Sequence, residues 1–170
     1  MKLVIPFNGL ISRNANYRFP WGKAAPFAMN GVHHRDVEAV GAAMLIKDLQ
    51  SQLIVDGEHV SPEMIKLLFK TIRPDRLMLI TDSIRAKGLG SGTYDLGGQN
   101  VTVSGTTVRL DNGNLAGSIL TMIDGVKNIV KYTDASLQDI MQMASINPAK
   151  QINQYGRKGS IAKGKDADIL

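Results

Sequence analysis

Apolar residues recur along this chain in two alternating patterns, short runs and amphipathic helical stretches. The short runs Leu53–Val55 and Leu77–Thr81 have the length and composition of buried strands. Between them, Ser61-Pro62-Glu63 carries the cap, proline and acid typical of a first helical turn, and Arg73-Pro74-Asp75 is expected to end that helix. The inward helix face is expected to comprise Ile65, Leu68 and Phe69. Together these segments predict a β-α-β unit with parallel strands and a right-handed crossover.

Residues 93–110 change to a period of two, which is typical of strands with one buried face. Turns are expected at Gly97-Gly98 and Ser104-Gly105. The strands they separate are Tyr94–Leu96, Val101–Val103 and Thr107–Leu110. This segment therefore predicts a small antiparallel insertion after the strand that leads to Asp82.

Helical periodicity predicts three further helices, of which Val37–Met44 is the first. A second helix follows Ser118, and a third begins at Ser136, where Asp139 completes a capping box, and is expected to close at Asn147-Pro148. The inward face of the second helix is expected to comprise Ile119, Met122, Ile123, Val126 and Val130. That of the third is expected to comprise Leu137, Ile140, Met141 and Ala144, with Met122, Met141 and Met143 as core filler.

The two ends of the chain follow neither period for long. Residues 1–27 are rich in proline, glycine and aromatic residues and predict an irregular arm with one strand at 2–5. Residues 159–170 predict a turn followed by a strand. The apolar start of the chain breaks at Asn8-Gly9, so no secretory signal is expected.

Composition narrows the function classes. The chain has 170 residues and a net charge of +5, but its lysines and arginines are scattered and do not interleave with aromatics, so nucleic acid is not an expected partner. It has no apolar run long enough for a membrane span and no cysteine, which excludes disulfides and thiolate metal sites and favours the cytoplasm. A complete (β/α)8 barrel typically needs about 250 residues, so if the pattern of this chain is barrel-like, only part of a barrel is expected.

Asp82 and His59 follow two strands of the predicted β-α-β unit, and parallel α/β folds place their chemistry at the carboxyl ends of strands. Asp82 either caps its turn or acts as a general base and acid on a metal-bound water. His59 is either a loop residue bonded to a backbone carbonyl, a substrate contact or a metal ligand. As a lone histidine it is a weak metal signal, since catalytic zinc usually has three protein ligands.

Two further segments have both a functional and a structural interpretation. Arg35 follows His33-His34, and this triplet is either a solvated turn or a phosphate contact through two parallel hydrogen bonds. The run Leu115-Ala116-Gly117-Ser118 either caps the next helix with Ser118 or lets a ligand approach its backbone.

The ordered set of motifs over residues 28–170 resembles the N-acetylglucosamine-6-phosphate deacetylase family of the amidohydrolase superfamily. The set is specific because its members recur in family order, although no single motif is decisive. The matching stretches are Ala28-Met29, His33–Asp36, Val40–Ala43, Asp56–Val60, Asp75–Leu77 through Thr81-Asp82, Gly92–Gly98, Leu115–Ser118, Met143–Ala149 and Arg157–Ile161.

The resemblance implies the C-terminal half of a metal-dependent (β/α)8 hydrolase barrel at 28–153, with a small β insertion. It further implies the start of a C-terminal β-sandwich segment at 154–170, with 1–27 outside the family pattern. The implied reaction is hydrolysis of the acetamido group of an amino-sugar phosphate, with release of acetate. In it, Asp82 is the catalytic acid–base residue, and His59, Arg35, Ala28, Leu115, Ala116 and Gly117 contact the substrate.

The chain departs from the family pattern where the metal should bind. The family has a metal-ligating histidine and a phosphate-binding asparagine just before Ala28-Met29, and this chain has Ala24 and Phe27 there. A divalent metal, Zn or Fe, is expected for the family, but no metal ligand is assigned here and the chain alone is not expected to hold it. The expectation is a truncated deacetylase acting as a homo-oligomer or with a complementing chain. Open alternatives are a non-catalytic sugar-phosphate or partner-binding module and an N-acetylgalactosamine-6-phosphate deacetylase.

Overall fold

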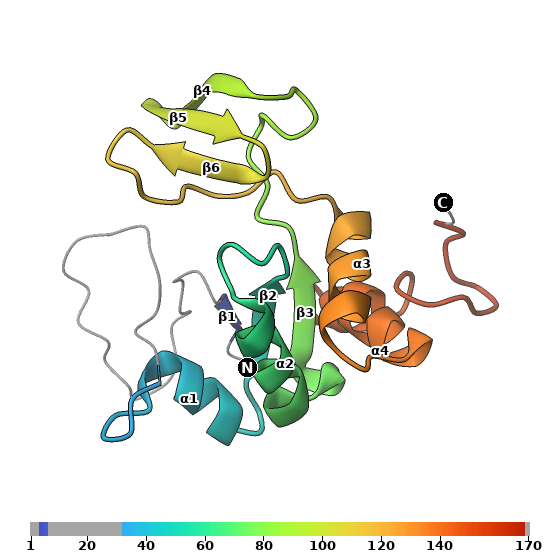
Figure 1. The fold of residues 1–170 in the computed structure, drawn as a ribbon. Coiled ribbons are helices and arrows are strands. Elements are labelled where there is room, and N and C mark those ends of the chain that lie inside the picture. Colours follow the sequence, from blue (N-terminus) through green and yellow to red (C-terminus); the bar gives the residue numbers. More distant parts are fainter. Residues whose placement is uncertain (1–3, 7–31, 169–170) are drawn as a thin grey trace.

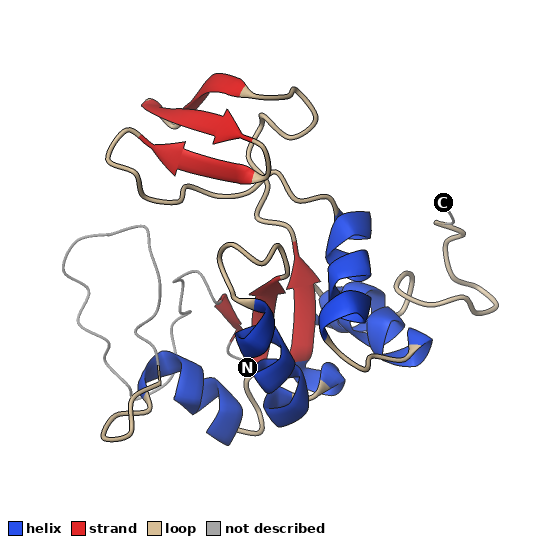
Figure 2. Cartoon of the chain, viewed as in Figure 1, coloured by secondary structure: helices blue, strands red, loops and turns tan. Residues whose placement is uncertain are grey.

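The computed structural model describes residues 4–6 and 32–168, which form a mixed α/β structure with two separate sheets (Figures 1 and 2). The first is parallel, in the order β1-β2-β3, and the second is antiparallel, in the order β4-β5-β6. The strands are β1 (Val4–Pro6), β2 (Gln50–Ile54), β3 (Leu77–Ile80), β4 (Gly92–Leu96), β5 (Gln99–Ser104) and β6 (Thr107–Leu110). The α/β class expected from the sequence is therefore confirmed.

The predicted β-α-β unit is present as β2, α2 (Pro62–Ile72) and β3, and its two strands are parallel. The Ser61 side chain accepts a hydrogen bond from the Met64 N–H at 3.3 Å, and the proline stands in the first turn. The helix ends at Arg73, whose φ of 73° lies in the left-handed region, and a short 3-10 turn, η1 (Pro74–Arg76), leads into β3. Local sequence signals therefore set both ends of this helix.

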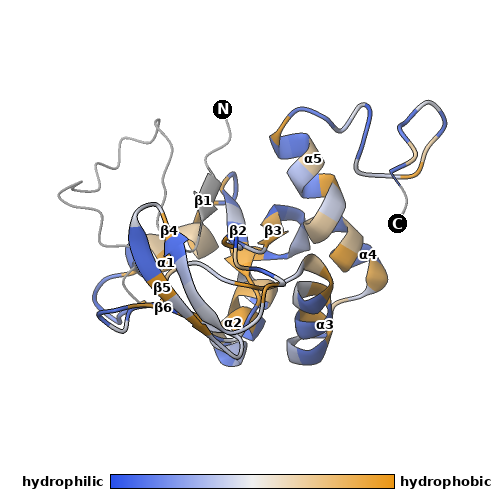
Figure 3. Ribbon diagram, turned by 90° about the horizontal axis from the view of Figure 1, so that it is seen from above, coloured by the Kyte–Doolittle hydropathy of each residue, from blue (hydrophilic) through white to orange (hydrophobic). Residues whose placement is uncertain are grey.

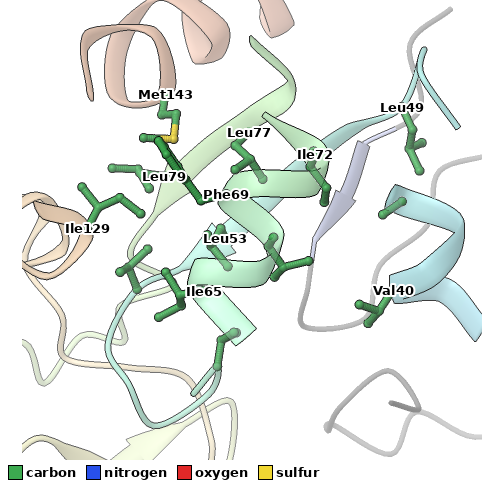
Figure 4. Close-up of a cluster of buried hydrophobic side chains, with 14 residues drawn as sticks. Val40, Leu49, Leu53, Ile65, Phe69, Ile72, Leu77, Leu79, Ile129 and Met143 are labelled. Atoms are coloured by element: carbon green, nitrogen blue, oxygen red, sulfur yellow. The ribbon is translucent and has the colours of Figure 1, made fainter. Parts of the chain in front are cut away.

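The main core lies between α2 and the parallel sheet (Figure 4). From α2, Ile65, Leu68 and Ile72 are completely buried against the side chains of β2 and β3. Each such apolar side chain stabilises the fold by roughly 1.5–3 kcal/mol. The face predicted for this helix is confirmed, with Ile72 added.

A buried arginine joins this unit to α1 (Glu38–Leu45), the short helix predicted at Val37–Met44. Arg76 is only 9% exposed, and its guanidinium donates to the Ile46 carbonyl at 2.6 Å and to the Ala43 carbonyl at 3.2 Å. These carbonyls lie at the carboxyl end of α1, where a cation is electrostatically favoured. Hydrogen bonding makes burial of this charge tolerable.

The antiparallel sheet forms where the period-two pattern predicted it, and it lies beyond the tip of β3 (Figure 1). Val101, Val103 and Val108 are buried on one of its faces. They pack against Ile84 and Ala116, which lie outside the sheet. The sheet thus has its own small core next to the carboxyl end of β3.

Helix α3 (Met122–Tyr132) forms as predicted, but the predicted inward face is largely wrong. Ile123 is 60% exposed and Val130 53% exposed, whereas Ile129 is completely buried. The Asn128 amide donates to the Val55 carbonyl at 2.8 Å, which fixes the rotation of the helix about its axis. This contact joins residues far apart in sequence, so the apolar period alone does not report it.

The next helix does not close at Asn147-Pro148 as predicted. It runs through α4 (Leu137–Met141), the π-helical segment η2 (Gln142–Ile146) and α5 (Asn147–Gln151). Its capping box at Ser136 and Asp139 is confirmed. In η2 the Asn147 N–H donates to the Gln142 carbonyl, five residues back. This wide turn lets the chain pass Pro148, which has no N–H and would end an ordinary α-helix.

The inward face predicted for this helix is confirmed in part, because Ile140 and Ala144 pack against the main core. Leu137 is 71% exposed and Met141 41% exposed, and the apolar parts of α3 and α4 are visible on the ribbon in Figure 3. Of the three predicted core methionines only Met143, in the π segment, is confirmed as buried, since Met122 is 39% exposed. The extra residue in each π turn shifts which side chains face inward.

At the ends of the chain the outcome is mixed. The strand predicted at 2–5 overlaps β1, which pairs in parallel with β2 and so covers its outer edge. The strand predicted in the tail is absent up to Asp168, the last residue that the structure describes, and turns and coil occupy 152–168. No helix within the described ranges is long and apolar enough to cross a membrane.

Candidate functional site

The candidate site lies at the carboxyl ends of β2 and β3, which are adjacent and parallel. Ile54 is paired with Ile80, so Asp56 and Asp82 each follow their strand by the same two residues. His59 lies in the turn after β2, and Asp82 begins the connection from β3 to the antiparallel sheet (Figure 1). The topology therefore brings both predicted residues to one edge of the sheet, as the sequence pattern implied.

His59 is held by Asp56, a residue to which the sequence analysis gave no role. The His59 Nδ1 lies 2.6 Å from the Asp56 Oδ2, and the side chains are 14% and 7% exposed. The other carboxylate oxygen, Oδ1, accepts from the backbone N–H groups of Glu58 and His59, both at 2.9 Å. An aspartate three residues before a histidine, with glycine between them, was the available sequence signal.

The interaction between His59 and Asp56 changes the pKa of each residue in the direction that favours its charged form. The hydrogen bond to Asp56 raises the pKa of His59 above 6.5, against the opposing effect of burial. The negative charges of Asp56, Asp82 and Glu58 add to this rise. Burial acts to raise the pKa of Asp56, but the His59 ring and backbone together lower it below 3.8. The site therefore favours an ion pair between His59 and Asp56, close enough to Asp82 for its charge to act on the ring.

Asp82 has an unusual backbone conformation at the end of β3. Its φ is 49°, in the left-handed region that costs a non-glycine residue roughly 1–2 kcal/mol. Its carbonyl accepts from the Ser118 N–H at 2.9 Å, and the Ile84 N–H donates to the Ser118 carbonyl at 2.9 Å. Asp82 is exposed, so its side chain is on the surface while its backbone is tied to a distant loop.

Ser118 holds this loop in place. Its buried hydroxyl donates to the Thr81 carbonyl and accepts from the Leu120 N–H at 3.1 Å. Ser83 donates to the Leu120 carbonyl at 2.6 Å. The Ser118 hydroxyl is therefore engaged with β3 as well as with its own turn, and the helix cap is supplied by Thr121, not by Ser118.

Gly117, one of the predicted loop residues, lies against the Asp82 backbone. Its φ is 68°, and a Cβ there would be 3.3 Å from the Asp82 carbonyl oxygen and 2.7 Å from the Ile84 Cγ2. Glycine is therefore needed both for the backbone conformation and for the close approach. Asp82 and Gly117 are brought together directly by the fold.

The remaining predicted contacts are arranged differently. Ala116 is buried in the core of the antiparallel sheet, and its N–H donates to the Val108 carbonyl at 3.0 Å. Leu115 is half-buried and forms a bridge with Arg109. Arg35 is exposed in the turn His33–Asp36 that precedes α1, and no contact between it and the residues after β2 and β3 is seen among the described residues. Ala28 lies outside the described residues.

Metal ligation is not provided by the described residues. Among them, no three histidine, aspartate or glutamate side chains are grouped so that they could hold a metal ion. At the strand ends, the Nδ1 of His59 is already bonded to Asp56. The part of the chain that the structure describes therefore does not fit a metal centre by itself.

A separate groove of 530 Å³ lies between the α4–α5 helix and the tail. Ile152 and Ile161 line it, and Lys165 closes one side by donating to the Ser160 hydroxyl at 2.7 Å. The Lys165 ammonium also lies 3.6 Å from the centroid of the Tyr155 ring. This groove contains none of the candidate site residues.

Comparison with known proteins identifies the family. Residues 29–170 match the model of the amidohydrolase family. The chain is 46% identical over 143 residues to the N-acetylglucosamine-6-phosphate deacetylase of Bacillus subtilis, covering 84% of this chain but 36% of that relative. It is 37% identical to a putative N-acetylgalactosamine-6-phosphate deacetylase of Escherichia coli K12, covering 84% of both proteins.

The structure agrees with these sequence matches. The crystal structure of N-acetylglucosamine-6-phosphate deacetylase from Thermotoga maritima superimposes with a TM-score of 0.77 at 38% identity, over 81% of this chain and 38% of that one. This chain belongs to the amidohydrolase family, whose members are generally metal-dependent. It spans a little over a third of the length of the Bacillus subtilis and Thermotoga maritima relatives.

Proposed function

We propose that this chain contributes the acid–base and substrate-holding residues of an amino-sugar-phosphate deacetylase. The observation that carries this proposal is the pairing of two strand ends. The end of β3 carries Asp82, and the end of β2 carries His59, which is hydrogen-bonded to Asp56. Gly117 lies against the Asp82 backbone. The relatives named as N-acetylglucosamine-6-phosphate deacetylases support the reaction class.

In the proposed reaction, water attacks the acetyl carbonyl of the acetamido group and the C–N bond breaks. Asp82 takes a proton from the attacking water and then gives it to the departing amine, so acetate and the amino sugar are released. The His59 ring binds the substrate, and Arg35 and Ala28 contact its phosphate group. The loop of Leu115, Ala116 and Gly117 lies along the sugar. Because Ala116 is buried, its contribution would be made by the backbone of the loop and not by its side chain.

We further propose that residues 28–153 are half of a (β/α)8 barrel and that 154–170 begin a β-sandwich segment, with 1–27 as a separate arm. The parallel order of β1, β2 and β3 with α2 on one face supports the barrel interpretation. We also propose that the chain acts as a homo-oligomer or with a complementing chain, in which the exposed Arg35 would reach the site of a neighbouring subunit. The cytoplasm is the proposed compartment.

The expected Zn or Fe does not fit the described residues, and no step of the proposed reaction is assigned to it. For catalysis, its ligands must come from other residues or from a partner chain. This observation favours a second candidate function, a non-catalytic module that binds the sugar phosphate or a partner. A galactosamine-specific deacetylase is a third candidate, because a short relative of this chain carries that name.

The deciding experiment measures metal content and acetate release on the same purified chain. Acetate is assayed with N-acetylglucosamine 6-phosphate and its galactosamine epimer, with and without added Zn²⁺ or Fe²⁺. Turnover of one epimer, lowered about 10³-fold or more by Asp82→Asn because the proton carrier is lost, would support the deacetylase, with its metal ligands supplied by other residues or a partner copy. Binding of the sugar phosphate without acetate release would support the module, and neither binding nor release would contradict both functions.

A further inference from the structure

The two carboxylate oxygens of Asp56 make different hydrogen bonds. Oδ1 accepts from the Glu58 and His59 backbone N–H groups and so closes the turn after β2. Oδ2 has none of these bonds and lies 2.6 Å from the His59 Nδ1. A turn cap needs only the first oxygen. The second oxygen, Oδ2, is therefore available to bond the His59 ring.

This geometry determines which ring nitrogen can meet a ligand. A carboxylate only accepts hydrogen bonds, so the His59 Nδ1 must carry a proton. Nε2 is then a lone-pair acceptor in the neutral ring and an N–H donor in the imidazolium form. Within the described ranges, Nε2 has no hydrogen-bond partner, and the ring is close enough to Asp82 for that charge to act on it.

The surroundings restrain this arrangement from several directions. The pair is mostly buried, with 14% of the His59 and 7% of the Asp56 side chain exposed. From α3, the Tyr132 hydroxyl approaches the intervening Gly57, 3.2 Å from where a Cβ would stand. Asp82 and Glu58 contribute negative charge around the ring. The His59 ring is thus fixed in position before any ligand arrives.

We infer that Asp56 is the positioning residue of the site, which fixes His59 as the Nδ1-protonated ring and aims Nε2 at an oxygen of the bound amino sugar. The inference rests on the proposed function for its ligand, but the state of the ring can be tested without any ligand. At a pH where the ring is cationic, Nε2 donates to a carbonyl or hydroxyl oxygen. When the ring is neutral, Nε2 can only accept a hydrogen bond, for example from a hydroxyl group of the sugar.

The test is ¹⁵N NMR of the imidazole rings over a pH titration of the whole chain. The chain has three histidines, so His59→Gln assigns the signals of His59 by their loss. In the unaltered protein we expect the Nδ1-protonated tautomer and a titration midpoint above 6.5. A predominantly Nε2-protonated neutral ring would overturn the inference directly, with no variant needed.

Asp56→Asn is the decisive variant, because it keeps an oxygen for the turn and removes the charged acceptor. We expect its His59 to titrate lower and to change to the Nε2-protonated tautomer, which an amide donor to Nδ1 favours. Glu58→Gln is the matched control: it removes a neighbouring charge, but Glu58 bonds to Asp56 through its backbone N–H, which the substitution keeps. It should leave the tautomer unchanged.

Ligand binding separates this inference from the proposed function. With N-acetylglucosamine 6-phosphate as the probe, we expect Asp56→Asn to weaken binding by about tenfold or more, the loss typical of a supporting residue. Asp56→Glu, which restores a carboxylate, should recover part of this loss. If the unaltered chain does not bind the sugar phosphate, the proposed function fails while the tautomer result still stands. An unchanged ring in a folded Asp56→Asn variant would reject the positioning role.

Discussion

An aspartate follows β2 and another follows β3 at the same distance from the strand end, but the two strand ends are held by different kinds of contact. After β2, the hydrogen bonds of the Asp56 carboxylate within the described part of the chain span no more than three residues. After β3, the chain is fixed by the segment around Ser118, and the bond from Ser118 to Thr81 joins residues 37 apart. Local contacts form at little cost in chain entropy, whereas distant ones require the intervening antiparallel sheet to be in place. One half of the site is therefore a local turn, and the other depends on tertiary structure.

Breaking the distant contact should have the largest effect. A side chain at Gly117 would stand 2.7 Å from the Ile84 Cγ2 at a φ of 68°. We expect Gly117→Val to lower the free energy of unfolding by about 3 kcal/mol, combining backbone strain with overpacking. Equilibrium urea unfolding measures this loss.

The matched control for this variant is Gly113→Ala, since Gly113 has a φ of 85° but nothing within 4 Å of an added Cβ. It should cost about 1 kcal/mol, the backbone part alone. Equal losses at the two positions would contradict the idea that the close approach to the end of β3 matters.

Disturbing the local turn should have an intermediate effect. Gly57 has a φ of 82°, and a Cβ there would lie 3.2 Å from the Tyr132 hydroxyl. We expect Gly57→Ala to cost about 1–2 kcal/mol in unfolding free energy, mainly from the left-handed backbone. Adding Tyr132→Phe to Gly57→Ala should recover a few tenths of this loss if the hydroxyl contributes to the crowding. A double-mutant cycle in urea tests the coupling, and strict additivity would reject it.

The smallest effect should be a change in the pH dependence of stability. The raised pKa of His59 contributes stability that is complete below 6.5 and is lost as the pH rises through the folded value. The lowered pKa of Asp56 contributes stability that is complete above 3.8 and is lost as the pH falls through its folded value. The pair therefore stabilises the fold most between these two pH values, and the loss outside this window should be smaller than the losses expected at Gly117 and Gly57.

Urea midpoints between pH 3 and 9 would show this effect as a difference between the unaltered chain and His59→Gln. The difference should be largest inside that window and should shrink on both sides. A difference that does not vary with pH would mean that packing of the ring, and not its charge, supplies the stability.

The same distinction between local and distant contacts explains how far the sequence could predict the fold. The strands β2 and β3, the capped start of α2 and the three antiparallel strands follow from periodicity and turn residues within short windows. The rotation of α3 does not, because it depends on Asn128 reaching the Val55 carbonyl, 73 residues away. The continuation of the helix past Pro148 depends on a π turn, for which the apolar period gives no signal.

For the candidate site, the sequence predicted which strand ends would meet but not how they are held. The adjacency of Asp82 and His59 follows from the β-α-β rule. The ring contact of Asp56 could have been predicted from its spacing to His59. The bonds of Ser118 to the end of β3 could not, because they depend on how the antiparallel insertion folds back.

The π segment has a consequence for how this region tolerates insertions and deletions. An α-helix turns by about 100° for each residue, so removing one residue from 142–146 would rotate all that follows by that angle. Asn147 would then move away from the Pro74 and Leu77 carbonyls, to which its amide donates at 2.8 and 2.6 Å. The extra residue therefore sets the angular register between two stretches of helix. Deleting one residue here would make the helix regular but would displace the segment that follows it.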